Sequence, residues 1–201
     1  MPLQDIMVDI LNANWDHEIT RFSLPPLMTL FLGEPGTGGS STPSMVGAVK
    51  KWQKLDPRKS LETWKLLSEA NSSLEKQFNF LSKLAKEQWD EYRHLIDCCS
   101  KLKVEKWSEL AKTSKEEAVI KALLGSREAM LSIRHYMRLM GEDAGVPIEP
   151  ELQTQLLDAT MGMEGVLLAG VPGAGGFDAI FAVALGESNN NLGTVILHDK
   201  A

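Results

Sequence analysis

The chain has 201 residues, of which 43% are hydrophobic and 24% are charged, and its formal net charge is −6 at pH 7. This composition is typical of a globular protein of one or two domains, and the acidic balance argues against a nucleic-acid partner, which requires a dense basic surface. No apolar run is long enough to span a bilayer, and the N-terminus lacks the basic start and small-residue cleavage site of a signal peptide, so no membrane partner is expected.

The first predicted strand is the apolar run Leu27–Leu32, which we expect to be buried. A glycine-rich loop, GEPGTGGSS (33–41), comes next. Thr42 followed by a proline is a helix-start signal with Thr42 as the N-cap residue, and this helix is expected to end near Asp56.

A long helical region begins near Ser60. Its apolar residues recur every three or four positions and predict one buried stripe: Leu61, Trp64, Leu67, Leu74, Phe78, Leu81, Ala85 and Tyr92. We interpret the aromatic members as core residues rather than cofactor contacts. Asn71 interrupts the stripe, and a polar side chain there needs a partner if it is buried, either a neighbouring helix or a ligand.

The adjacent cysteines Cys98 and Cys99 are not expected to form a structural disulfide with each other, which favours a reducing, intracellular compartment. Two cysteines and four scattered histidines show no metal-ligand spacing. No metal-binding residue is therefore predicted.

A third helix is predicted from about Ser114 to Met140, ended by Gly141 and Gly145. Its expected inner face consists of Ala118, Leu123, Met130, Ile133 and Met137. Arg127 and Arg134 lie seven residues apart on this helix. We interpret them as a solvated edge, with a role as anion-binding residues as the alternative.

The last predicted elements are a short helix over 151–160 and two apolar runs, 165–169 and 179–185, that favour strands. A strand, several helices and then two strands predict an α+β domain with helices stacked on a small sheet. The tail, 186–201, is polar apart from 194–197.

The segment between the last two strands contains Gly173, Ala174, Gly175 and Gly176. Glycines let a backbone approach a phosphate, and consecutive N–H groups can then form an anion-binding concavity. The segment is not a dinucleotide fingerprint, because Asp178 stands where the third glycine is required. A tight hairpin turn explains the pattern almost equally well.

The first glycine loop has the glycine spacing of a P-loop, but Gly39 stands where the lysine should be. Ser40, Ser41 and Thr42 lie at a helix N-terminus, where free N–H groups favour anions. Capping by Thr42 and anion binding are compatible readings. If both glycine loops lie at one edge of the sheet, they would form two walls of one anion site.

Two long segments, LGEPGTGGSSTPSMVGAVKKW (32–52) and VLLAGVPGAGGFDAIFAV (166–183), closely resemble phosphomevalonate kinases of the GHMP kinase superfamily, the plant-type enzymes most of all. The segment IEPELQTQLLDATM (148–161) resembles the same family. The likeness runs from about Trp15 to Gly186.

The resemblance implies a GHMP-kinase C-terminal domain over 26–185, with a ferredoxin-like small antiparallel sheet and several long helices. Residues 1–25 would be a remnant of the N-terminal domain, and 186–201 an atypical tail. The implied reaction transfers the ATP γ-phosphoryl group to 5-phosphomevalonate, giving 5-diphosphomevalonate and ADP with Mg²⁺, a step of the mevalonate route to isoprenoids. The loop 171–178 would be the superfamily's third motif, beside the substrate, and Ser40, Ser41 and Thr42 would face the same cleft.

The superfamily's nucleotide loop, P-x-x-x-G-L-G-S-S-A, has no counterpart in the 201 residues, and the expected catalytic lysine and acidic residues are also missing. The chain is therefore expected to be a truncated product without kinase activity of its own, because phosphoryl transfer depends on positioning the nucleotide. Two alternatives are another GHMP small-molecule kinase and a non-catalytic protein that pairs with a complete kinase.

Two further expectations concern Asp178 and the compartment. Asp178 beside a phosphate-binding loop could serve the loop, a bound cation or the substrate, or it could be a turn residue that bonds its own backbone. The compartment implied by the family is the cytosol, with peroxisomes in some lineages.

Overall fold

The computed structural model describes residues 22–35 and 41–186. In chain order, its elements are β1 (Met28–Gly33), α2 (Thr42–Leu55), α3 (Pro57–Glu87), α4 (Trp89–Cys99), the 3₁₀ helix η1 (Val104–Glu109), α5 (Ser114–Ala144), α6 (Glu151–Met161), β2 (Val166–Gly170) and β3 (Ile180–Leu185). The prediction of an α+β chain with a small antiparallel sheet and mostly helices is confirmed.

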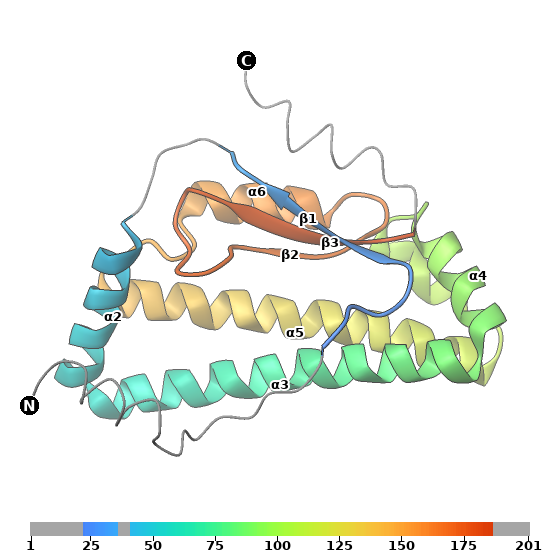
Figure 1. Cartoon of the computed structure of the whole chain (residues 1–201), viewed down its shortest axis with the longest axis horizontal. Coiled ribbons are helices and arrows are strands. Elements are labelled where there is room, and N and C mark those ends of the chain that lie inside the picture. Colours follow the sequence, from blue (N-terminus) through green and yellow to red (C-terminus); the bar gives the residue numbers. More distant parts are fainter. Residues whose placement is uncertain (1–21, 36–40, 187–201) are drawn as a thin grey trace, which may run out of the picture.

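The three strands pair antiparallel in the order β1-β3-β2, with Met28 opposite Leu185 and Gly33 opposite Ile180. α6 covers one face of the sheet, and α5 covers the other with α3 beyond it (Figure 1). Each face has its own core cluster. One joins α6 to the sheet through Leu157, and the other joins the sheet to α3, α4 and α5.

β1 is more exposed than its apolar sequence predicts. Leu30 and Leu32 are 51% and 71% exposed. The reason is position: within the described residues β1 pairs only with β3, so it is an edge strand and the helices do not cover its outer side. The expectation of a buried strand over 27–32 is therefore wrong.

The long helical region begins earlier than predicted and is divided in two. Asp56 caps α3 by accepting a hydrogen bond from the backbone N–H of Lys59 at 3.1 Å. Gln88, with φ −146° and ψ 61°, separates α3 from α4, so Tyr92 belongs to α4 and donates to the Pro26 carbonyl oxygen at 2.7 Å.

The predicted stripe on α3 is correct at its C-terminal end and wrong at its start. Phe78 and Leu81 are core residues, whereas Leu61 and Trp64 are 71% and 40% exposed. At the start of α3 the buried face is formed by Ser60 and Thr63 instead. Both hydroxyls donate to carbonyl oxygens of the preceding turn, which satisfies them without a partner outside the helix.

α5 begins with a capping box in which Thr113 and Glu116 bond each other's backbone N–H groups. The helix ends at Gly145, which is left-handed with φ 69°, and not at Gly141. Gly141 lies inside α5, and a Cβ there would meet the Val146 carbonyl oxygen at 2.6 Å. This glycine therefore allows the connection after α5 to pass close to the helix.

Candidate anion site at one edge of the sheet

The structure brings the ends of both glycine loops to the same edge of the sheet. The first loop leaves β1 after Gly33, and the second enters β3 at Ile180, which is the residue paired with Gly33. α2 begins on the far side of the first loop (Figure 1). The local geometry therefore agrees with two loops that flank one site.

The start of α2 differs by one residue from the prediction. Ser41, and not Thr42, is the N-cap residue, and its side chain makes no capping hydrogen bond. Both residues are exposed. Ser40 lies outside the described residues.

The second loop is built on three glycines with positive φ, namely Gly173 at 61°, Gly175 at 78° and Gly176 at 99°. The N–H of Gly176 donates to the Ile148 carbonyl oxygen at 2.7 Å, and that of Gly175 to the Pro172 carbonyl oxygen at 3.1 Å. Two of the four predicted donors are thus used to hold the loop in place.

The backbone N–H groups at the tip of this loop are not bonded to other backbone groups of the described residues. In residues 22–35 and 41–186, the N–H groups of Gly173 and Ala174 donate to no backbone carbonyl. Gly173 is exposed and Ala174 is half-buried. The predicted cradle would therefore offer its backbone donors at this tip, and Asp178, four residues further on, is exposed.

Arg127 is not on a solvated edge. Its guanidinium donates to the carbonyl oxygens of Met161, Val166 and Leu167 at 2.6, 3.2 and 3.3 Å. These bonds tie α5 to the start of β2, at the opposite end of that strand from the glycine loop. Burial lowers the pKa of Arg127. The reading of Arg127 as part of a solvated edge is therefore wrong, and its reading as an anion-binding residue stays a prediction that these bonds disfavour.

Arg134 is also buried, with a side chain only 2% exposed. Its Nε lies 3.1 Å from both oxygens of Glu149, and its Nη2 lies 2.8 Å from Glu149 Oε1 and 2.8 Å from Asp158 Oδ1. Burial acts to lower the pKa of Arg134, but the hydrogen bonds and charges of the two carboxylates raise it overall. The anions that Arg134 contacts are therefore the protein's own carboxylates.

Asn71 is exposed, and its side-chain amide donates to the Leu67 carbonyl oxygen of its own helix at 2.9 Å. Within the described residues it makes no interhelix hydrogen bond, and the ligand contact considered from the sequence stays a prediction. A mid-helix amide that bonds the preceding turn needs no other partner.

Sequence reasoning missed two residues of this region, Arg138 and Glu149. The Glu149 carboxylate is fully buried and accepts from Arg138 Nη1 at 2.7 Å and from Thr154 Oγ1 at 3.0 Å, in addition to Arg134. The available signal was a third arginine four residues after Arg134. It could have indicated a buried acceptor shared by one helix face.

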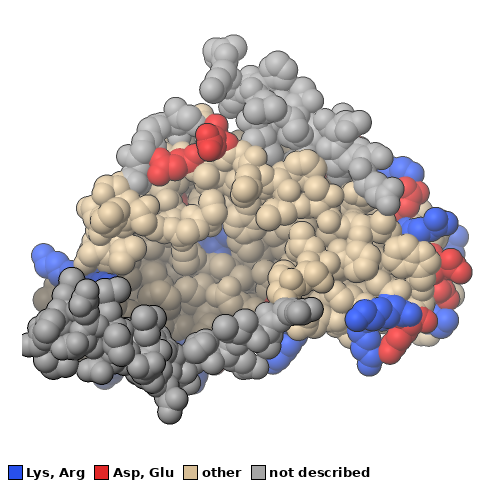
Figure 2. Space-filling model, viewed as in Figure 1, with Lys and Arg blue, Asp and Glu red and all other residues tan. Residues whose placement is uncertain are grey.

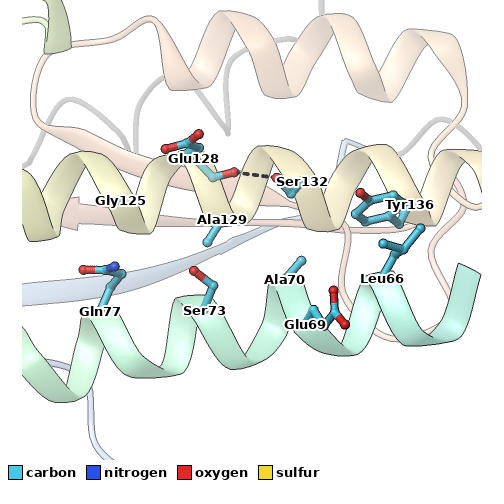
Figure 3. Close-up of a pocket in the computed structure, with 10 residues that line it drawn as sticks. All are labelled: Leu66, Glu69, Ala70, Ser73, Gln77, Gly125, Glu128, Ala129, Ser132 and Tyr136. Carbon is cyan, nitrogen blue, oxygen red and sulfur yellow. Dashed lines mark hydrogen bonds between the residues drawn. The ribbon is translucent and has the colours of Figure 1, made fainter.

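A separate pocket of about 370 Å³ lies between α3 and α5 (Figure 3). None of the predicted site residues lines it. Its α5 wall includes Ser132 and Tyr136, on the side of the helix away from Arg134. Glu69 and Glu128 at its rim disfavour an anionic ligand.

Figure 2 shows the face on which β1 lies. It is hollowed in its middle, between the sheet and α3, and most of the charged surface visible on it lies toward its two ends. A small basic patch shows inside the hollow.

Residues 22–35 and 41–186 contain neither a candidate metal site nor a candidate membrane span. No group of three or more His, Cys, Asp or Glu side chains there could hold a metal ion. No helix in that part of the chain is long and apolar enough to cross a membrane.

The chain is similar to curated phosphomevalonate kinases. It is 64% identical over 192 residues, 96% of its length, to the peroxisomal phosphomevalonate kinase of Arabidopsis thaliana, of which the match covers 38%. It is 31% identical over 90% of its length to the phosphomevalonate kinase of Candida albicans, covering 37% of that protein, and 32% identical over 83% to that of Aspergillus fumigatus, covering 28%. The predicted resemblance, strongest to the plant enzyme, is confirmed.

The chain spans well under half the length of the curated relatives it matches. No family model matches it. Among solved structures, a Lin0012 protein from Listeria innocua superposes with a TM-score of 0.48 and 16% identity over 96% of this chain and 44% of that one. A likeness at this level does not establish a shared fold.

Proposed function

We propose that this chain is the acceptor-binding portion of an ATP-dependent phosphomevalonate kinase. The complete enzyme would transfer the γ-phosphoryl group of ATP to 5-phosphomevalonate, yielding 5-diphosphomevalonate and ADP, as a step toward isoprenoids and sterols. The observation that carries the proposal is the 64% identity to the Arabidopsis enzyme over 96% of the chain. Relatives with the same printed name in two fungi favour it over another small-molecule kinase or a non-catalytic partner protein.

The arrangement at the sheet edge supports the same proposal. Within the described residues the N–H groups of Gly173 and Ala174 donate to no backbone carbonyl, and the N-terminus of α2 has no side-chain cap. Both features favour a phosphate. Ser40, Ser41, Thr42 and the glycine loop are accordingly proposed as substrate-binding residues, and the functional role of Asp178 stays a proposal.

We further propose that the described domain is a GHMP-kinase C-terminal domain with a ferredoxin-like sheet over 26–185. In a ferredoxin-like sheet the first three strands pair in the order 1-3-2 and are all antiparallel, which matches β1-β3-β2 here. Mg²⁺ is proposed to accompany ATP. The described residues offer no metal-ligand cluster, so no part of the metal's chemistry is assigned to them.

The compartment is proposed from the relatives. The plant relative is named as a peroxisomal protein, and the half-exposed and buried cysteines are both free thiols, as a reducing compartment would keep them. A cytosolic or peroxisomal location is compatible with both observations.

The test is a thermal melt of the purified chain with and without 5-phosphomevalonate. A transition that rises with ligand is expected, since a ligand that binds only the native state stabilises it. A ligand-insensitive melt would contradict the proposed half-site. The same chain should release no ADP from ATP and 5-phosphomevalonate above a heat-killed control, because the nucleotide loop is not among its residues.

A further inference from the structure

We propose that Arg138 is the side chain that binds the phosphate group of the acceptor substrate at the glycine-loop edge, and that the buried carboxylate of Glu149 orients it. This inference rests on the proposed function. Neither residue belongs to the two glycine loops, and neither was predicted from the sequence.

Two successive residues connect Arg138 to the glycine loop. Arg138 Nη1 lies 2.7 Å from Glu149 Oε1, and the residue before Glu149, Ile148, accepts the N–H of Gly176 at 2.7 Å. Gly175 also packs directly on the Ile148 backbone. Ile148 therefore bonds the glycine loop, and the next residue, Glu149, bonds Arg138.

Arg134 and Arg138 differ in how many of their N–H donors the protein uses. Arg134 is 2% exposed, and its N–H groups donate to Glu149, Asp158 and the Met161 sulfur. Arg138 is 33% exposed and bonds Glu149 through Nη1. Within the described residues its Nε and Nη2 have no hydrogen-bond partner. A guanidinium has five N–H donors in a fixed fork, so these remaining groups can bind a phosphate oxygen pair.

The charges around Arg138 also favour an anion. Arg134 and Arg138 are positive, and Glu149 is the only carboxylate of this network that is fully buried. Asp158, the other carboxylate, is 62% exposed and contacts Arg134. The two arginines and two carboxylates balance in sum, but Asp158 contacts Arg134 and Glu149 is shared by both arginines, so Arg138 has only a shared carboxylate beside it, which favours an anion on its exposed side.

The test compares calorimetric affinities of the purified chain for 5-phosphomevalonate, mevalonate and ATP. Arg138→Gln removes the charge, and Arg138→Lys keeps the charge but cannot bond Glu149 and a phosphate in the same forked geometry. Arg93→Gln is the matched control, because Arg93 is an exposed arginine on α4, the helix farthest from α2 (Figure 1).

Arg138→Gln is expected to weaken 5-phosphomevalonate binding at least about tenfold, the usual effect of losing a hydrogen bond to a charged group. Arg138→Lys should lose less, and Arg93→Gln nothing. Affinity for mevalonate, which has the carboxylate and no phosphate, should not change. If Arg138→Gln does not fold by circular dichroism, Arg138→Lys carries the comparison.

Three results would overturn the inference. Unchanged 5-phosphomevalonate affinity in both Arg138 variants would do so while leaving the proposed function intact. A loss of affinity that is equal for mevalonate, or that appears for ATP alone, would assign Arg138 to a different group. A wild-type chain that binds no 5-phosphomevalonate would remove the inference and the proposed half-site together.

Discussion

Replacement of Arg134 by Met is the most informative perturbation of the structure. Arg134 is 2% exposed, and the carboxylate of its partner Glu149 is fully buried. Breaking a buried ion pair costs about 3–5 kcal/mol, because one charge stays buried without its partner. Glu149 would keep its bonds from Arg138 and Thr154, at 2.7 and 3.0 Å, so the lower end, about 3 kcal/mol, is expected.

The assay is urea denaturation followed by tryptophan fluorescence, with the midpoint expected to fall and the slope to stay constant. In a thermal melt the same loss corresponds to a midpoint lower by about 6–12 °C for a chain of this size. The control is Lys101→Met, which breaks the exposed pair with Asp97 (69% and 63% exposed). That change should cost at most about 1 kcal/mol.

A double variant, Arg134→Met with Glu149→Met, separates the charge from the packing. Apolar residues of similar volume replace a buried ion pair at little net cost, so the double variant should recover most of the stability lost by Arg134→Met. The reasoning would be refuted by a single variant no less stable than the Lys101 control. A double variant as unstable as the sum of the two single variants would refute it as well.

Three further predictions use matched positions. Gly175→Ala should destabilise the chain well beyond Gly173→Ala in urea melts, because a Cβ at Gly175 collides with a backbone carbonyl while Gly173 has open space and only its positive φ. Iodoacetamide at pH 8 should label Cys98 and spare Cys99, whose pKa burial raises to about 12, until urea unfolds the chain. Glu116→Gln should lower stability at pH 7 and progressively less below about pH 4.5, since a backbone N–H before α5 lowers the pKa of Glu116 and that stabilisation disappears as the folded carboxylate is protonated.

Hydrophobic periodicity and chain punctuation predicted most of the elements, but not the division of the long helical region into α3 and α4 or the 3₁₀ helix η1. The strands at 165–169 and 179–185 and the helices from Thr42 and Ser114 lie within a few residues of their observed positions. These signals are local, because they depend on which face of each element is apolar. What they could not supply is the position of a strand in its sheet, and this is why β1 was expected to be buried.

The glycine loop shows the same limit at the site. Its composition predicted four residues that could contact an anion, but which N–H groups stay free depends on what else approaches the loop. Ile148, far away in sequence, uses the N–H of Gly176. No pattern within the loop could have indicated that contact.

The arginines of α5 explain why most of the candidate site could not be read from the sequence. Arg127 and Arg134, seven residues apart, have the spacing expected of a solvated edge, yet each is held by acceptors from other elements. Burying an arginine is favourable only when such acceptors are in place, and the acceptors for Arg134 come from the segment after α5 and from α6. Glu149 therefore decides that Arg134 is structural, and by occupying only one nitrogen of Arg138 it leaves that arginine able to bind a ligand.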